Sequence, residues 1–134
     1  MFSTAPLYYN TVLFQEAGQA PPDATWTWQQ AVAVAQKLTK TGATSADSTY
    51  GLNLTQYGES ILFSYGWTYT NADYSQCMLE TDANAQGMQF WQDLIYKYKV
   101  APAPGSDFGK GAPFGVFSTI RLAMETQGSY QIGS

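Results

Sequence analysis

Apolar side chains recur at the spacing of an α-helix in two long stretches of the chain. The first lies between Thr25, a favourable N-cap, and Gly42, a favourable helix terminator. The second begins at Thr81 or Asp82 and ends before Pro102. The stripes expected to be buried are Trp28, Ala31, Val32, Ala35 and Leu38 in the first helix, and Ala85, Met88, Trp91, Leu94, Ile95 and Tyr98 in the second. The aromatic residues of both helices are expected to pack in the core rather than to hold a ligand.

Shorter runs predict the strands and helices around these two. The runs expected to be strands are 4–9, 50–54 and 121–125, with a further short strand near Cys77 to Leu79. The runs expected to be short helices are 11–17, 58–65 and 114–119. The rest of 67–80 is irregular, and the glycines of 105–113 predict a flexible loop. Because strands alternate with helices, the pattern predicts one α/β domain over residues 1–134.

The composition favours neutral polar partners. Charged residues make up 12% of the chain, about half of the usual share, whereas aromatic residues make up 16% and include ten Tyr and four Trp. The surface must therefore be built largely from hydroxyl, amide and phenol groups. The net charge is −4 with six Lys and Arg in all, and nucleic acids require clustered cations, so we expect no nucleic acid partner.

Several kinds of site lack the residues that they need. The chain has no His and a single Cys, so neither an internal disulfide nor a zinc site of the usual Cys and His kind can form. Cys77 is expected to be a small, partly buried residue. The commonest general base is missing, and no nucleophile elbow or phosphate-binding loop occurs. We therefore expect no enzymatic activity, no cofactor and no metal.

Two targeting signals are not found in the sequence. The chain has no run of the roughly 18 apolar residues that a membrane span needs. Its first residues lack the basic and apolar regions of a signal peptide. The last residues, from Gly128 onward, read as the start of a helix that stops early, so the C-terminus is expected to be a cut end.

A series of short segments carries a family resemblance through their order and spacing. The segments are Leu7-Tyr8-Tyr9-Asn10, Leu13-Phe14, Ala17-Gly18, Pro21-Pro22, Thr25-Trp26, Tyr50-Gly51-Leu52, Asp82 to Leu94, Val100-Ala101-Pro102, Phe117, Ala123-Met124 and Gly128 to Gly133. Together they resemble the family 1 extracellular solute-binding proteins of ABC sugar importers, which are maltose-binding-protein-like. The resemblance covers nearly the whole chain.

The resemblance implies one lobe of a periplasmic-binding-protein-like fold, with a small mixed sheet flanked by helices. Members of the family have two α/β lobes that close around a ligand, and the segments quoted resemble the second, C-terminal lobe. Residues 1–10 and 127–134 then correspond to hinge-proximal segments. The chain is expected to be the central part of the second lobe, with the first lobe absent.

The resemblance also implies a function and a set of partners. The expected ligand is a sugar, an oligosaccharide or another small polar solute, and the other partners are the first lobe of the parent protein and an ABC permease. The expected location is periplasmic or extracellular, at the membrane through a lipoprotein anchor or the permease. The alternative is a structural domain without ligand binding, which associates as a homodimer through exposed cleft surface or sheet edges.

A sugar site needs aromatic faces for the ring and planar polar groups for the hydroxyl rim. Tyr130 is the first candidate, because it stands where the family has a Trp that packs on the ligand. The exchange of Trp for Tyr keeps a stacking surface but makes it smaller. The alternative role of Tyr130 is packing at the hinge.

Five further candidates lie on either side of the short helix expected at 58–65. Gln56, Tyr57 and Glu59 stand where a strand ends and this helix opens, and free N–H groups of a helix start add hydrogen-bond donors. Trp67 and Tyr69 follow the helix in a loop and offer a further stacking surface. The alternatives are plain surface residues in the first group and aromatic rings folded onto the core in the second.

Overall fold

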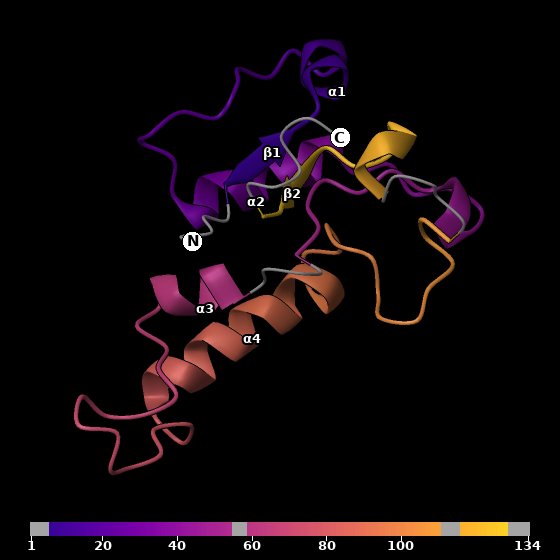
Figure 1. Ribbon diagram of the computed structural model, residues 1–134. Coiled ribbons are helices and arrows are strands. Elements are labelled where there is room, and N and C mark those ends of the chain that lie inside the picture. Colours follow the sequence, from indigo (N-terminus) through magenta and orange to yellow (C-terminus); the bar gives the residue numbers. More distant parts are fainter. Residues whose placement is uncertain (1–5, 55–58, 111–115, 129–134) are drawn as a thin grey trace.

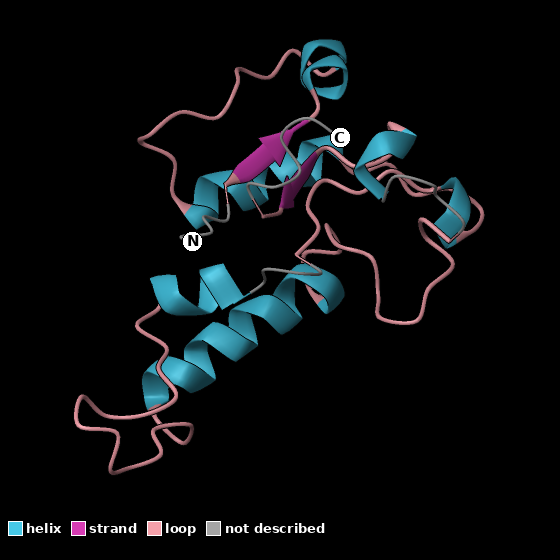
Figure 2. Cartoon of the chain, viewed as in Figure 1, coloured by secondary structure: helices cyan, strands magenta, loops and turns pink. Residues whose placement is uncertain are grey.

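The computed structural model describes residues 6–54, 59–110 and 116–128 (Figure 1). The elements along the chain are β1 (Leu7–Tyr9), α1 (Thr11–Glu16), α2 (Trp28–Leu38), η1 (Ser45–Asp47), α3 (Glu59–Ser64), α4 (Asp82–Tyr96), η2 (Val116–Thr119) and β2 (Met124–Thr126). The strands and α2 lie together in one part of the molecule, while α3 and α4 lie side by side in another (Figure 1). Long loops join these elements (Figure 2).

The sheet is small and consists of two antiparallel strands, with one further segment bridged in parallel beside it. β1 and β2 pair antiparallel, and the register sets Leu7 opposite Thr126, Tyr8 opposite Glu125 and Tyr9 opposite Met124. Residues 50–54 run parallel to β2 along its other edge, through isolated bridges at Tyr50 and Asn53. The α/β prediction is therefore confirmed, although the segment at 50–54 makes bridges rather than a regular strand. The strand expected near Cys77 is reduced to one bridge between Thr70 and Cys77.

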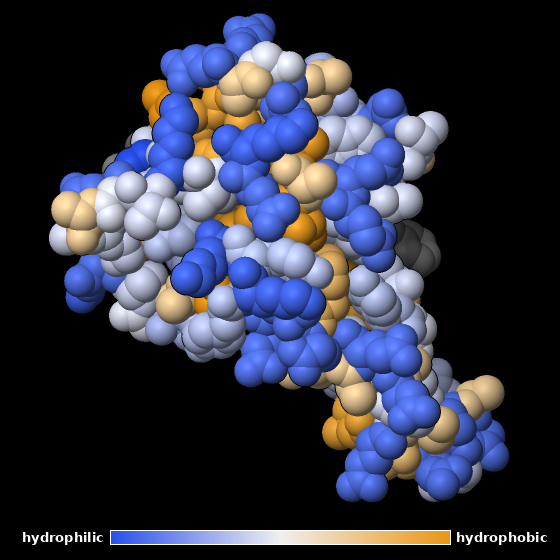
Figure 3. All heavy atoms as spheres, turned by 180° about the vertical axis from the view of Figure 1, so that it is seen from behind, coloured by the Kyte–Doolittle hydropathy of each residue, from blue (hydrophilic) through white to orange (hydrophobic). Residues whose placement is uncertain are grey.

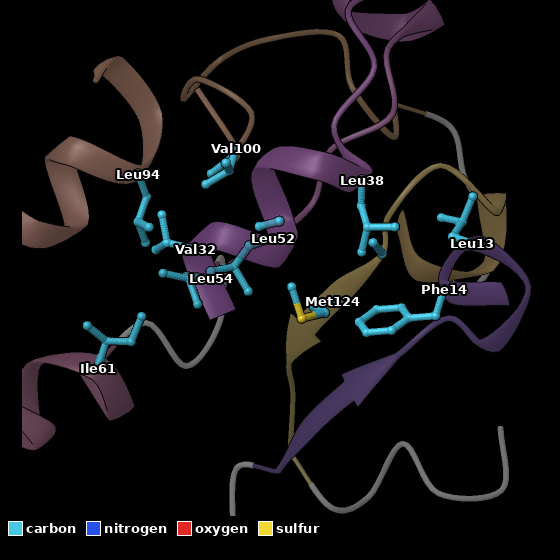
Figure 4. Close-up of a cluster of buried hydrophobic side chains, with 13 residues drawn as sticks. Leu13, Phe14, Val32, Leu38, Leu52, Leu54, Ile61, Leu94, Val100 and Met124 are labelled. Carbon is cyan, nitrogen blue, oxygen red and sulfur yellow. The ribbon is translucent and has the colours of Figure 1, made fainter. Parts of the chain in front are cut away.

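The core lies between the sheet, the helices α1 and α2, and the α3–α4 pair. Met124 of β2 lies beside Phe14 of α1 and Leu38 of α2, and Leu54 extends the cluster toward Ile61 of α3 (Figure 4). The buried cluster comprises Leu13, Phe14, Val32, Ala35, Leu38, Leu52, Leu54, Ile61, Leu94, Val100, Ala101, Ala123 and Met124. The helical aromatic residues Trp28, Phe90, Trp91 and Tyr98 are partly buried against it, as predicted.

The start of α2 differs from the prediction by two residues. Thr27, not Thr25, is the N-cap, because a capping box needs a Glu or Gln three positions later and Gln30 supplies it. The Thr27 backbone N–H donates to the Gln30 side chain over 2.8 Å, and the Gln30 N–H donates to the Thr27 hydroxyl over 3.3 Å. Thr25 instead donates from its hydroxyl to the Asp23 carboxylate over 2.6 Å. α2 also ends at Leu38, before Gly42.

The buried face of α4 departs from the predicted stripe in the first half of the helix, whereas Trp91, Leu94 and Ile95 of the second half pack in or against the core as predicted. The fully buried residues of this helix are Asn84, Gly87 and Leu94, whereas Met88 is 52% exposed and Ala85 is exposed. The reason is the close approach of α3 at Gly87. A Cβ atom at Gly87 would lie 3.2 Å from the Leu62 Cδ2 atom, so α3 fits against the face where no side chain intervenes.

The third residue after the end of α4, Lys99, is in an unfavourable backbone conformation. Lys99 has φ +55°, which glycine adopts without steric cost. We expect Lys99→Gly to raise the free energy of unfolding by about 0.5–1 kcal/mol, measured by urea denaturation. Lys97→Gly is the matched control: Lys97 has φ −93° and bridges Asp93, so this change should lower stability. Equal destabilisation by both changes would contradict the interpretation.

Candidate functional site

Three chain segments meet at one end of the sheet. β1 begins at this end, and both β2 and the segment 50–54 run toward it and end there. The Gln127 N–H donates to the Pro6 carbonyl over 3.3 Å, and the Thr126 N–H donates to the Asn53 carbonyl over 3.3 Å. We call the edge formed by these four residues the sheet end.

Buried polar side chains gather at the sheet end. Asn53 is 2% exposed and Glu125 3% exposed, and the Asn53 Nδ2 atom donates to Glu125 Oε1 over 3.0 Å. Next to them, Thr126 Oγ1 and Gln127 Oε1 are buried and have no hydrogen-bond partner within the described ranges. Buried polar atoms are normally paired, so these two oxygens leave hydrogen-bonding capacity unused.

Four of the six predicted contacts are close to the sheet end along the sequence. Gln56 and Tyr57 follow Asn53 by three and four residues, and Tyr130 follows Gln127 by three. These three lie outside the described residues. Glu59 is the first residue of α3, but the placement of its side chain is also outside what the structure describes.

Trp67 and Tyr69 lie together, and away from the sheet end. Their rings meet edge to face with centroids 4.2 Å apart, and Trp67 also meets Phe63 of α3 at 5.8 Å. Tyr69 is 48% exposed. Both follow the last turn of α3, and the loop that carries them extends away from β1 and β2 in Figure 1. The structure therefore places Trp67 and Tyr69 on a surface apart from the sheet end.

A residue that the sequence analysis missed organises this loop. Asn84 is 1% exposed on α4, and its Nδ2 atom donates to the carbonyls of Thr68 and Met78, each over 2.8 Å. Its Oδ1 atom accepts from the Thr68 N–H over 3.0 Å. One carboxamide thus satisfies three backbone groups on both arms of the loop. A usable signal was present: Asn stands on the inner face of a helix, where it has poor propensity.

A cavity of about 730 Å³ opens between the segment before α2 and the last turn of α3. Trp26, Trp28 and Tyr65 form aromatic walls, and Asp23 is the charged residue of the lining. Hydrogen bonds from the Thr25 hydroxyl and N–H hold the pKa of the Asp23 carboxyl below its usual range. Burial raises the pKa of the Tyr65 phenol, so its hydroxyl stays protonated.

A second cavity, of about 410 Å³, lies behind residues 50–54 and is lined by uncharged residues. Asn53 lines it together with Trp91, Pro102 and Phe108. Phe108 is 8% exposed, and its ring meets the Tyr50 ring at 4.7 Å. Apolar walls with one amide suit a neutral ligand rather than an ion.

The described residues contain neither a metal-binding cluster nor a membrane-spanning helix. No group of three or more His, Cys, Asp and Glu residues stands close enough there to hold a metal ion. None of the helices in these ranges has the length and apolar character that crossing a bilayer requires. Cys77 is exposed, which corrects the expectation that it is partly buried, because its loop projects into solvent.

Comparison with known proteins places this geometry in a family. The family model described as "Bacterial extracellular solute-binding protein" matches residues 1–131. No curated protein sequence matches the chain.

Solved structures share the fold. An ABC substrate-binding protein of Listeria monocytogenes in complex with cycloalternan is 26% identical with a TM-score of 0.77; the match covers 94% of this chain and 32% of that one. The maltotriose-binding protein of Thermus thermophilus, bound with maltotriose, is 26% identical with a TM-score of 0.66, over 98% and 33% of the two chains. The chain thus spans about a third of the length of these relatives.

Proposed function

The chain belongs to the bacterial extracellular solute-binding proteins, and from this membership we propose that it binds a sugar for uptake through an ABC transporter. Two relatives that are 26% identical were solved with a cyclic or linear oligosaccharide. The low charge and high aromatic content of this chain suit the same class of ligand. The proposed act is binding without chemical change.

The sheet end is the proposed solute site. The observation that carries this proposal is the meeting of β1, 50–54 and β2 at one edge, where Thr126 Oγ1 and Gln127 Oε1 are left without partners in the described segments. Tyr130, Gln56, Tyr57 and Glu59 follow this edge along the chain. In the proposed site the tyrosine rings cover the sugar face and the polar side chains bind its hydroxyl rim. We assign Trp67 and Tyr69 to a separate surface.

The site is proposed to be one half of a cleft. In this proposal residues 1–134 form the central part of a second lobe, with hinge-proximal segments at 1–10 and 127–134. A first lobe closes over the sugar, and the closed form docks on a permease. The chain alone should then bind weakly, because losing half of the contacts costs several kcal/mol and about 1.4 kcal/mol is a tenfold loss of affinity.

The test is a titration of the chain with mono-, di- and oligosaccharides, followed by NMR because weak binding is expected. We expect a dissociation constant weaker than micromolar, and a further weakening of about tenfold in Tyr130→Ala, which removes the stacking ring. Tyr96→Ala is the control: this Tyr is 62% exposed at the far end of α4 and should not affect binding. Micromolar or tighter binding would contradict the half-site, and equal effects of both variants would contradict the role of Tyr130.

A further inference from the structure

The loop between α3 and α4 exposes large apolar side chains. We call residues 65–81 the tip loop. Tyr74 is 84% exposed, Leu79 50% and Tyr69 48%, and Phe63 on the adjoining α3 is 52% exposed. In Figure 3 apolar atoms lie among polar ones on the part that projects furthest from the body of the molecule. Several large apolar side chains exposed on one projecting segment are a candidate interaction site on a soluble protein.

The charge around the tip loop has one sign. No Lys or Arg occurs between Lys40 and Lys97. Asp73 and Glu80 in the loop and Asp82 at the start of α4 are exposed acids. The Ser75 hydroxyl donates to Asp73, which keeps the pKa of that carboxyl below its usual value. The segment that carries the exposed apolar residues therefore also carries negative charge that no cation of this segment offsets.

The backbone conformation of Tyr74 costs free energy, and burial of its ring does not offset this cost. Its φ is +61°, a region where a bulky residue is an outlier and Asn or Gly is favoured. Because its ring is 84% exposed, packing within the chain cannot account for a Tyr at this position. Backbone strain of this kind concentrates where a side chain must be presented for function.

Hydrogen bonds within the chain hold the tip loop in one conformation without a bound partner. Asn84 bonds both arms of the loop at Thr68 and Met78. At its turn, the Gln76 N–H donates to the Asn71 carboxamide oxygen over 3.1 Å. A surface that is already ordered loses less conformational entropy on binding.

We propose that the tip loop is a docking surface for a partner protein whose surface carries Lys and Arg around an apolar patch. Charge complementarity selects this occupant, since exposed carboxylates attract basic groups while Tyr74, Tyr69 and Leu79 supply the apolar centre. A sugar is uncharged, so the one-sided charge of this segment does not favour it over a basic partner. An anionic membrane surface would repel the acids.

The test uses a fluorescent peptide of alternating lysine and leucine, titrated with the chain at low salt, and the same peptide with glutamate in place of lysine. We expect the basic peptide to bind and the acidic one not to bind. Tyr74→Asn should weaken binding about tenfold, because an exposed aromatic anchor is lost. The same variant should be as stable as the parent or more so in urea, because Asn tolerates a positive φ, so weaker binding cannot come from unfolding.

Matched controls distinguish a specific effect of the tip loop from the effects of net charge and of nonspecific hydrophobic binding. Glu80→Lys should weaken binding several-fold more than Glu16→Lys, which makes the same charge change on exposed α1. Tyr96→Asn removes an exposed Tyr elsewhere and should have no effect. Equal effects within either pair would overturn the proposal. The proposal would also be overturned if Tyr74→Asn abolished sugar binding, or if it abolished self-association seen by light scattering.

This proposal stands apart from the solute site. Tyr130→Ala should leave peptide binding unchanged, and Tyr74→Asn should leave the sugar titration unchanged. Failure of one proposal therefore leaves the other intact.

Discussion

Gly51→Ala should destabilise the protein by about 3 kcal/mol or more, a large fraction of the total stability of a small domain. A Cβ atom at Gly51 would lie 2.1 Å from the Ala35 carbonyl oxygen and 2.4 Å from the Ala35 Cα atom. Both are backbone atoms of α2, so no side-chain rotation relieves the overlap. The contact is also fixed by the Gly51 N–H, which donates to the Thr39 hydroxyl over 2.9 Å. Urea denaturation followed by circular dichroism measures the effect.

Gly18→Ala is the matched control for this substitution. Gly18 has φ +62°, but a Cβ atom there would meet nothing within 4 Å. The expected cost is about 1 kcal/mol, from backbone conformation alone. If Gly51→Ala cost no more than Gly18→Ala, the close approach of residues 50–54 to α2 would be disproved.

Asn84→Leu is expected to cost about 3 kcal/mol, because three part-buried backbone groups lose their hydrogen bonds and each lost bond costs about 1 kcal/mol. Leucine has a similar volume, so the loss comes from hydrogen bonds rather than from a cavity. The groups affected are the N–H and carbonyl of Thr68 and the carbonyl of Met78. Urea denaturation gives the free energy, and hydrogen exchange should show faster opening of the tip loop.

Gln86→Leu places the same side chain at an exposed position on the same helix. It should change stability by less than about 0.5 kcal/mol. A similar loss in both variants would mean that the effect belongs to leucine in α4 and not to the carboxamide of Asn84.

The helices were predictable from the sequence, but their ends and buried faces were less so. Thr25 and Thr27 are both acceptable caps by type, and only Thr27 has Gln three positions later to complete a capping box. A rule that considered the pair rather than the single residue would have chosen correctly. Strands were harder, because 50–54 has the composition of a strand but contacts β2 through bridges.

The face of α4 could not be placed from hydrophobicity alone. Met88 fits the apolar period but is 52% exposed, while the polar Asn84 is buried. The outcome depends on α3, which approaches at Gly87, and on the loop carbonyls that Asn84 satisfies. Both are tertiary contacts that a helical repeat does not encode.

The candidate site stays a prediction, because the side chains of four of its six residues lie outside what the structure describes. The sequence indicated that aromatic and polar residues follow the ends of strands, and the described parts of those strands do meet at one edge. The pairing of Trp67 with Tyr69 and its separation from the sheet end depend on where the last turn of α3 points. The buried pair of Asn53 and Glu125 was not anticipated, because these residues are 72 positions apart and meet through the tertiary pairing of residues 50–54 with β2.

The one-sided charge of the tip loop makes the molecule an electric dipole. Asp82 and the loop acids stand at one end of α4. At the other end, about 22 Å away for 15 helical residues, Lys97 is paired with Asp93 and Lys99 carries the remaining positive charge. Near a positively charged object the molecule therefore experiences a torque that turns its tip forward before contact. At physiological ionic strength this torque acts only within about 8 Å of the surface. The salt concentration therefore determines the fraction of collisions with a basic partner in which the tip loop faces that partner.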